Sequence, residues 1–206
     1  MRFESATFSL SVHDPRKLPL GKLPEVAFIG RSNAGKSSAL NALAGRRRLA
    51  FVSKTPGRTQ LINFFSVGDD AFLVDLPGYG YAGVPLEVRK HWEVLVGGYL
   101  SSRQALVGVI VVMDSRHPLA PPDRLLLDWL KPTGRAVHVV LTKCDKLSAQ
   151  AASRTLAATR KALVETYPGA TVQLFSSMKR AGVEEAKARI ENWVREQKTK
   201  GPGERG

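Results

Sequence analysis

The chain has 206 residues, of which 43% are hydrophobic, so it is long enough to bury a core and we expect a single domain. Its 31 Lys and Arg residues exceed its 18 Asp and Glu residues, and the net charge of +13 favours a polyanionic partner (RNA, DNA or an anionic surface) over a protein that is merely basic. Cys144 is the only cysteine, which excludes an internal disulfide and fits a reducing cytoplasm, and no apolar run is long enough to be a signal peptide or to span a bilayer.

Apolar runs and helical patterns alternate along the chain from about Glu25 onward. They predict a strand over 25–30, a helix over 36–44, strands over 61–67 and 71–76 joined by a turn at 68–70, and a helix with an apolar face of Val88, Trp92, Leu95, Val96 and Tyr99. They then predict a central strand over 105–113, a helix over 123–130, a strand over 136–141, a helix through Leu156, Leu163 and Tyr167, a strand over 171–175, and a helix through Val183, Ala186, Ile190 and Trp193. This alternation is typical of an α/β fold with helices on both faces of a mostly parallel sheet, whose ligand lies beyond the carboxyl ends of the strands.

The two ends of the chain depart from this pattern. Residues 1–23 form an N-terminal extension, in which the alternating Phe8, Leu10 and Val12 can add a strand. Residues 24–197 form the main domain. Residues 198–206 form a basic tail that we expect to be disordered.

A phosphate-loop motif lies between the first strand and the first helix of the main domain. It reads Gly30-Arg31-Ser32-Asn33-Ala34-Gly35-Lys36-Ser37 and fits G-x-x-x-x-G-K-[ST]. Its glycines let successive backbone N–H groups face phosphate oxygens at the positive end of the helix. Lys36 is expected to reach the β- and γ-phosphates, and the Ser37 hydroxyl to ligate Mg²⁺. A chance match at a tight turn is the alternative, and the flanking strand and helix argue against it.

A second motif ends the strand predicted over 71–76 and reads Asp75-Leu76-Pro77-Gly78. A carboxylate at this place can hold Mg²⁺ through water, and the Gly78 N–H can meet the γ-phosphate. Many strand-ending Asp residues only cap a turn, so the motif gains its meaning from following the phosphate loop.

A third motif, Thr142-Lys143-Cys144-Asp145, ends another predicted strand and selects the base. An ionised Asp145 can accept hydrogen bonds from N1–H and the 2-amino group of guanine, whereas adenine would leave the carboxylate unpaired. The stem of Lys143 can cover one face of the base. Backbone N–H groups of Phe175-Ser176-Ser177, after the next strand, can meet the guanine O6. A surface Lys–Asp pair in a loop is the alternative for Lys143 and Asp145.

A loop with hydroxyl, glycine and proline residues lies between the first two motifs and reads Ser53-Lys54-Thr55-Pro56-Gly57-Arg58-Thr59-Gln60-Leu61. Such a loop can carry a threonine to Mg²⁺ and the γ-phosphate when GTP is bound and release it afterwards. Thr59 is the first candidate and Thr55 its rival. A solvated connection is the alternative.

The order of these motifs resembles the Ras-like GTPases, and the motifs themselves resemble the bacterial EngB (YihA/YsxC) family. The likeness rests on the phosphate loop, on residues 53–65 and 75–81, and on Asp114-Ser115-Arg116-His117-Pro118 and Phe175-Ser176-Ser177. It implies a Ras-like G domain over 24–197 in a monomeric cytoplasmic GTPase that binds GTP, GDP and Mg²⁺. It also implies roles in large ribosomal subunit assembly and in cell division and septation, with ribosomal RNA or a precursor particle as partner.

The same resemblance assigns roles by position. Ser37 and Thr59 would ligate Mg²⁺, and Lys36, Thr59 and Gly78 would act on the reacting phosphate. The nucleotide would be lined by Gly30–Ser37, by Gly57, Arg58, Thr59, Gln60 and Leu61, by Asp75, Leu76, Pro77 and Gly78, by Thr142, Lys143, Cys144 and Asp145, and by Phe175, Ser176 and Ser177. Cys144 stands where the family leads us to expect alanine.

The residue that orients the attacking water in Ras-like GTPases is absent from this sequence. Ras-like GTPases orient the attacking water with a glutamine after the D-x-x-G glycine, and this chain has Tyr79 there, so we expect slow hydrolysis by the isolated protein. Either a potassium ion held with the help of Asn33 or a ribosomal partner could complete the site. Asn33 could equally serve only to brace the loop.

The basic surplus suggests how a ribosomal partner is bound. Arg46-Arg47-Arg48 follows the first helix, and Arg31, Arg58, Arg89 and Lys90 are further candidates for a basic face that GTP-ordered switch loops present to RNA. Two other classes remain open from the residues alone: a nucleotide kinase or ATPase that shares the phosphate loop, and a nucleic-acid-binding module with a vestigial nucleotide site.

Overall fold

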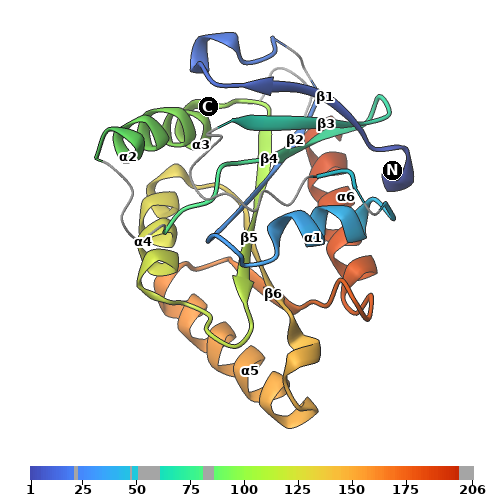
Figure 1. Ribbon diagram of the computed structural model, residues 1–206, viewed down its shortest axis with the longest axis vertical. Helices are drawn as coiled ribbons and strands as arrows, with labels where there is room; N and C mark the ends of the chain where they lie inside the picture. Colours follow the sequence, from blue (N-terminus) through green and yellow to red (C-terminus); the bar gives the residue numbers. More distant parts are fainter. Residues whose placement is uncertain (21–22, 47, 51–60, 81–85, 200–206) are drawn as a thin grey trace.

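The chain folds into a seven-stranded sheet with helices on both faces (Figure 1). The computed structural model describes residues 1–20, 23–46, 48–50, 61–80 and 86–199. The strands are β1 (Thr7–Val12), β2 (Glu25–Gly30), β3 (Ile62–Val67), β4 (Ala71–Asp75), β5 (Leu106–Asp114), β6 (Val137–Thr142) and β7 (Thr171–Leu174). The helices are α1 (Lys36–Leu43), α2 (Leu86–Trp92), α3 (Gly98–Ser102), α4 (Pro121–Leu130), α5 (Ala149–Thr166) and α6 (Val183–Thr199), with a π-helical turn η3 (Glu93–Gly97) and short 3-10 turns η1 (Phe3–Ser5), η2 (Pro15–Lys17), η4 (Lys131–Thr133) and η5 (Cys144–Lys146).

The strand order is β1-β3-β4-β2-β5-β6-β7. The strands β4, β2, β5, β6 and β7 run parallel, whereas β3 is antiparallel to both of its neighbours, β1 and β4. The carboxyl ends of the five parallel strands therefore lie along one edge of the sheet, where an α/β fold binds its ligand. The α/β class with a mostly parallel sheet is confirmed.

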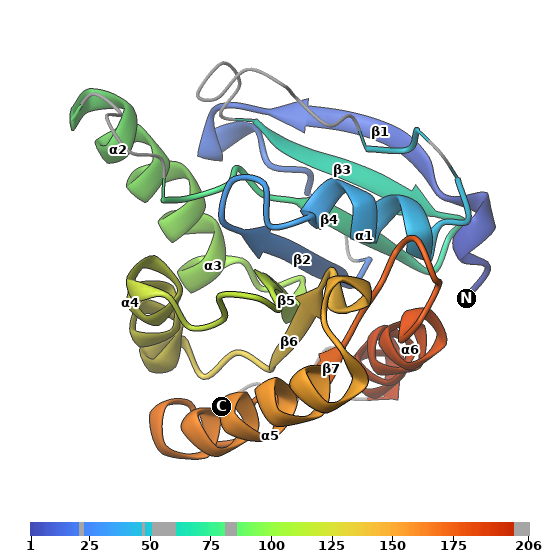
Figure 2. The same cartoon turned by 60° about the horizontal axis from the view of Figure 1, so that its bottom comes forward.

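Two apolar clusters fill the space on either side of the sheet. Because side chains alternate along a strand, β2 sends Ala27 and Ile29 to one cluster and Val26 and Phe28 to the other. The first cluster includes side chains of α3, α4 and α5, and the second includes side chains of α1 and α6. Figure 2 shows these two groups of helices on opposite sides of the sheet. β5 is buried along nearly its whole length, as expected for a strand covered by helices on both faces.

The bounds of several elements differ from the sequence prediction. The strand predicted as central, β5, lies beside the middle strand β2. The helix predicted through Val88 and Tyr99 is divided by the π-helical turn η3, which ends at Gly97, and α3 begins at Gly98. α4 begins at Pro121, two residues before the predicted start at Asp123. Proline suits the first turn of a helix, because its missing N–H is not needed there.

The two ends of the chain are partly described. Phe8, Leu10 and Val12 lie in β1, which pairs with β3 and shifts register between Phe8 and Leu10. α6 continues to Thr199, two residues into the predicted tail, and Lys198 Nζ lies 2.8 Å from Asp70 Oδ1. No proline or glycine interrupts 183–199, so nothing in the sequence stops the helix earlier. The rest of the predicted tail lies outside the described residues.

The adjacent glycines at the start of α3 provide a matched pair of substitutions. Both have helical backbone angles, but a Cβ atom at Gly97 would lie 2.4 Å from Cη2 of Trp129, whereas one at Gly98 would meet no atom within 4 Å. We expect Gly97→Ala to lower the free energy of unfolding by about 1–3 kcal/mol through overpacking. Gly98→Ala should raise it by roughly 0.5–1 kcal/mol, because alanine favours the helix. Urea denaturation of both variants measures this, and equal effects would contradict the close contact between Gly97 in η3 and Trp129 in α4.

Candidate nucleotide site

The phosphate loop curls tightly between β2 and α1. Asn33 has a φ of +62° and Gly35 a φ of +96°, and Gly35 precedes the first residue of α1. A Cβ atom at Gly30 would lie 2.6 Å from the carbonyl oxygen of Val112, so the close approach of β2 and β5 requires glycine there. A left-handed residue at the end of such a loop turns backbone N–H groups inward, which makes an anion-binding concavity at a helix N-terminus.

Lys36, the first residue of α1, forms an ion pair with Asp75 at the end of β4. Their side chains are only 13% and 12% exposed, so the pair is largely shielded from water. The structure thus brings together the lysine expected to bind phosphate and the carboxylate expected to hold Mg²⁺ through water. Ser37 follows Lys36 on the same helical turn and is half-buried. A hydroxyl and a carboxylate beside a phosphate cradle are the oxygen ligands that suit Mg²⁺, so these residues fit the ion.

Thr142, at the end of β6, connects this strand to the phosphate loop. Its hydroxyl oxygen lies 2.5 Å from the carbonyl oxygen of Ala34 and 3.0 Å from that of Met113. Lys143 follows with a φ of +58°, and its ammonium group donates to the carbonyl of Asn33 at 2.7 Å. The strand end that carries the predicted base-reading residues is thereby held against the loop that carries the predicted phosphate-binding residues.

Asp145 lies in η5 next to the segment that follows β7. The Ser176 hydroxyl donates to Asp145 Oδ1 at 2.5 Å, and the Cys144 N–H donates to the carbonyl of Phe175 at 3.2 Å. The hydrogen bond from Ser176 is the main cause that lowers the pKa of Asp145 below its usual value, so the carboxylate is ionised at neutral pH. These contacts bring the T-K-x-D and Phe175–Ser177 segments side by side.

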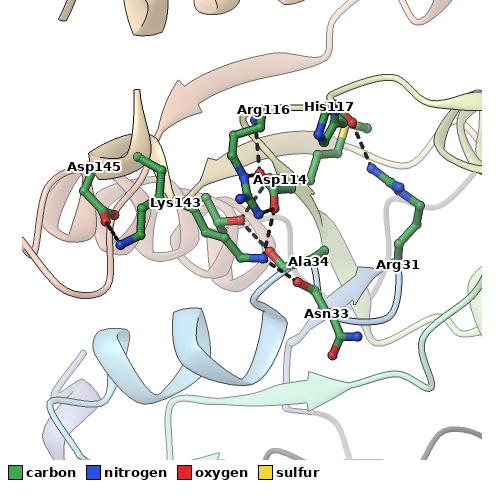
Figure 3. Close-up of polar contacts among 11 residues, drawn as sticks. Arg31, Asn33, Ala34, Asp114, Arg116, His117, Lys143 and Asp145 are labelled. Atoms are coloured by element: carbon green, nitrogen blue, oxygen red, sulfur yellow. Dashed lines mark hydrogen bonds and ion pairs between the residues drawn. The ribbon is translucent and has the colours of Figure 1, made fainter. Parts of the chain in front are cut away.

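Asp114, at the end of β5, is joined to the phosphate loop by Lys143, which contacts both (Figure 3). Lys143 Nζ lies 2.9 Å from Asp114 Oδ2, and Arg116 binds both carboxylate oxygens, at 3.0 and 2.7 Å. The Arg116 hydrogen bond, followed by that of Lys143, holds the pKa of Asp114 well below its usual range. The sequence motif Asp114–Pro118 carried the family resemblance but gave no role to Asp114.

We expect Asp114→Asn to weaken GTP and GDP binding alike, by about three- to tenfold, because the ammonium of Lys143 loses its charged partner. Arg116→Ala is the matched control: it removes the outer contact, whose side chain is 45% exposed, and leaves the Asp114–Lys143 pair intact. Its affinities should stay within about twofold of the parent. Titration with a fluorescent GDP measures both variants, and equal losses would contradict the positioning of Lys143 by Asp114.

Arg31 turns its side chain away from Asp114 and Lys143, toward α4 (Figure 3). Its Nε lies 3.0 Å from Oδ1 of the fully buried Asp123, and its Nη2 donates to the carbonyl of His117 at 2.8 Å. Tyr79 is buried as well, and its hydroxyl donates to the same Asp123 Oδ1 at 2.8 Å. Burial is the main cause that raises the pKa of Tyr79. Asp123 carried no functional signal in the sequence, because an Asp near the start of a helix normally indicates only a cap.

The remaining candidates are placed only in part. Gly57, Arg58, Thr59 and Gln60 lie outside the described residues, and Leu61 directly precedes β3. In the basic-face candidates, Arg46, Arg48 and Lys90 are exposed, while Arg47, Arg58 and the side chain of Arg89 lie outside the description. Arg46 donates to the carbonyl of Glu4 at 3.1 Å. Among the residues that the structure describes, no helix is both long and apolar enough to cross a membrane.

The fold and the site together define a P-loop GTPase of the Ras-like type. Residues 25–143 match the sequence profile of a family described as "50S ribosome-binding GTPase". A "Probable GTP-binding protein EngB" of Methylobacillus flagellatus is 58% identical over 192 residues, which are 93% of each chain. Its counterpart in Nitrosomonas europaea is 56% identical over 191 residues, 93% of this chain and 86% of the other. The chain belongs to the EngB family of GTP-binding proteins.

Solved structures share the fold at lower identity. A crystal structure of a probable GTP-binding protein engB has a TM-score of 0.62 and 20% identity, and the match covers 84% of this chain and 99% of that one. Era, solved with MgGDPNP and nucleotides 1506–1542 of 16S ribosomal RNA, has a TM-score of 0.63 and 21% identity, and the match covers 83% of this chain and 56% of Era. These two structures support the Ras-like arrangement of the sheet.

Proposed function

We propose that this protein is a slow GTPase switch that acts in the cytoplasm in assembly of the large ribosomal subunit and is needed for normal cell division and septation. The observation that carries the switch is the meeting of three motifs at one edge of the sheet, through the Lys36–Asp75 ion pair and the Lys143–Asn33 hydrogen bond. The description of the matched family, the RNA bound to Era and the net charge of +13 support a ribosomal partner.

Within this proposal each motif has one task. Ser37, Thr59 and Asp75 would hold Mg²⁺, and the ion would neutralise charge on the phosphates. Lys36 and the backbone N–H groups of the phosphate loop bind the phosphates, and the Gly78 N–H binds the γ-phosphate. Asp145 accepts from N1–H and the 2-amino group of guanine, with the stem of Lys143 against the base.

A further group is needed to speed hydrolysis. Tyr79 holds the place of the water-orienting glutamine, and its hydroxyl is bound to Asp123, so it supplies no such group from this position. A potassium ion near Asn33 and a group from the ribosomal partner are the two candidates. The Asn33 carbonyl already accepts from Lys143, and its side-chain amide points away from that contact (Figure 3). A GTPase rate that is equal in potassium and sodium salts would remove the first candidate and leave Asn33 as a brace.

Binding to the large subunit precursor tests the ribosomal role. The purified protein, loaded with a non-hydrolysable GTP analogue or with GDP, is sedimented with precursor particles at increasing salt. We expect retention with the analogue only, and an affinity that falls steeply as salt rises, because phosphate contacts release counterions. Retention that ignores the nucleotide would favour a nucleic-acid-binding module with a vestigial site, and displacement of the analogue by ATP would favour the ATPase or kinase class.

A charge reversal with a matched control tests the basic face. Arg48 is exposed after α1, and Arg160 is exposed on α5. Arg48→Glu should weaken particle binding and reduce its salt dependence, whereas Arg160→Glu should leave both nearly unchanged. Equal effects of the two reversals would mean that the net charge, and no particular face, drives binding.

A further inference from the structure

The carboxylate of Asp123 lies where three segments of the site meet. Its Oδ1 accepts from Nε of Arg31 in the phosphate loop at 3.0 Å and from the hydroxyl of Tyr79 after the D-x-x-G motif at 2.8 Å. Its Oδ2 accepts from the N–H of Ala120 at 3.0 Å, which caps the start of α4. Asp123 is fully buried, and these hydrogen bonds and the ion pair with Arg31 stabilise its charge.

The backbone at Tyr79 is held against the phosphate loop on both sides. Its N–H donates to the carbonyl of Gly30 at 3.3 Å, and its carbonyl accepts from the N–H of Ser32 at 3.2 Å. The hydroxyl bond to Asp123 therefore fixes a residue whose peptide already borders the phosphate-binding loop. Gly78, the residue proposed to meet the γ-phosphate, directly precedes it.

The other side of Gly78 has an anchor of its own. Trp92, at the end of α2, donates from its indole Nε1 to the carbonyl of Pro77 at 3.0 Å. The Trp92 ring packs edge-on against Tyr79, with centroids 6.4 Å apart, and lies 5.8 Å from the ring of Trp129 on α4. Hydrogen bonds thus hold both neighbours of Gly78: Trp92 binds Pro77, and Asp123 binds Tyr79. Both contacts connect to α4, because Asp123 lies in α4 and Trp92 packs against Trp129 of α4.

We propose that Asp123 is a positioning residue for γ-phosphate recognition, which it performs by holding the Tyr79 hydroxyl so that the Gly78 N–H faces the phosphate loop. The inference rests on the proposed role of Gly78 and goes beyond it, since Asp123 touches no nucleotide. A peptide held in advance binds the γ-phosphate without first losing backbone freedom, whereas GDP offers no γ-phosphate and gains nothing from the arrangement. The contacts of Trp92 with Pro77 and Tyr79 place an indole beside the residues proposed to meet the γ-phosphate, so tryptophan emission can report which nucleotide is bound.

Tyr79→Phe removes the hydroxyl and keeps the ring against Trp92, so it tests the anchor with little change in packing. We expect the affinity for a non-hydrolysable GTP analogue to fall about five- to tenfold, and the affinity for GDP to stay within about twofold. Tyr167→Phe is the matched control, because the Tyr167 hydroxyl donates to the carbonyl of Arg135 at 2.8 Å in another buried setting, away from the phosphate loop. It should leave the ratio of the two affinities unchanged.

Two further measurements separate positioning from a structural role. Asp123→Asn should lower the same ratio, and Tyr79→Phe added to it should lower the ratio little further, because both act through one hydrogen bond. Tryptophan emission should differ between the analogue-bound and GDP-bound parent, and this difference should shrink in Tyr79→Phe. An unchanged ratio of the two affinities in Tyr79→Phe, whether neither affinity falls or both fall equally, would overturn the proposal. Ribosomal particles do not enter the experiment, so a failed ribosomal role leaves its outcome unaffected.

Discussion

Asp145→Asn should abolish the preference for guanine, with an expected loss of GTP and GDP affinity of about a hundredfold or more. The substitution replaces two charge-assisted hydrogen bonds, each contributing about 1.5–3 kcal/mol, with an amide that presents a donor to the donors of guanine. Competition between fluorescent GDP and unlabelled nucleotides measures the change. In the parent, ATP should not displace GDP.

Xanthine nucleotides provide the positive control for this variant. Xanthine carries a carbonyl oxygen where guanine has its 2-amino group, so an asparagine amide at 145 can donate to it and accept from N1–H. We expect the variant to bind xanthosine diphosphate more tightly than GDP. Ser176→Ala, which removes the 2.5 Å hydrogen bond to Asp145, should cost far less than Asp145→Asn. A variant that still prefers guanine would show that the T-K-x-D segment does not read the base, and the site would need another base-reading residue.

Lys36→Met should lower the affinity for both GTP and GDP by about a hundredfold or more, because the phosphates lose a charge-assisted contact of up to about 3 kcal/mol. The same change should lower the free energy of unfolding of the nucleotide-free protein by about 1–3 kcal/mol, since Asp75 is left without its partner in a place that is only 12% exposed. Fluorescent GDP titration and urea denaturation measure the two effects.

The double variant Lys36→Met with Asp75→Asn separates these effects. Removing the second charge should restore most of the lost stability, because no unpaired carboxylate remains. It should not restore nucleotide binding, for which Lys36 itself is needed. Recovery of both properties, or of neither, would contradict the account of the ion pair as a structural contact between two nucleotide-binding residues.

Local patterns in the sequence were sufficient to predict the strands of the sheet. β2, for example, was predicted with the bounds that it has, because its apolar run ends on the glycine that starts the phosphate loop. The strand order was not accessible in the same way, since the antiparallel pairing of β1 with β3 joins segments some fifty residues apart and local periodicity carries no such information. The π-helical turn η3 carried no local signal either; its last residue, Gly97, packs against Trp129, which is a contact between two elements.

The residues of the candidate site also differ in whether local sequence patterns predicted them. Glycine spacing and strand-ending carboxylates indicated the phosphate loop, Asp75 and Asp145, because those roles follow from residue type and order. Asp123 and Asp114 carried no such signal: each acts through partners distant in sequence, Arg31 and Tyr79 for the first and Lys143 for the second. The buried Glu25, which accepts from Tyr99 and Arg103, was read only as the start of a strand for the same reason.

The pairing of β3 with β4 has a consequence for how this protein folds. The two strands are joined by a three-residue turn with Gly68 at a φ of +53°, while every other neighbouring pair in the sheet must close a much longer loop. Because loop closure slows the formation of distant contacts, we expect the β3–β4 hairpin to form first and the pairing of β1 to come late. Pulsed hydrogen exchange during refolding should then protect Phe65 and Leu73, which pair with each other, before Leu10 in β1, and the reverse order would contradict this sequence of events. The early hairpin ends at Asp75, so one wall of the nucleotide site is laid down before the sheet is complete.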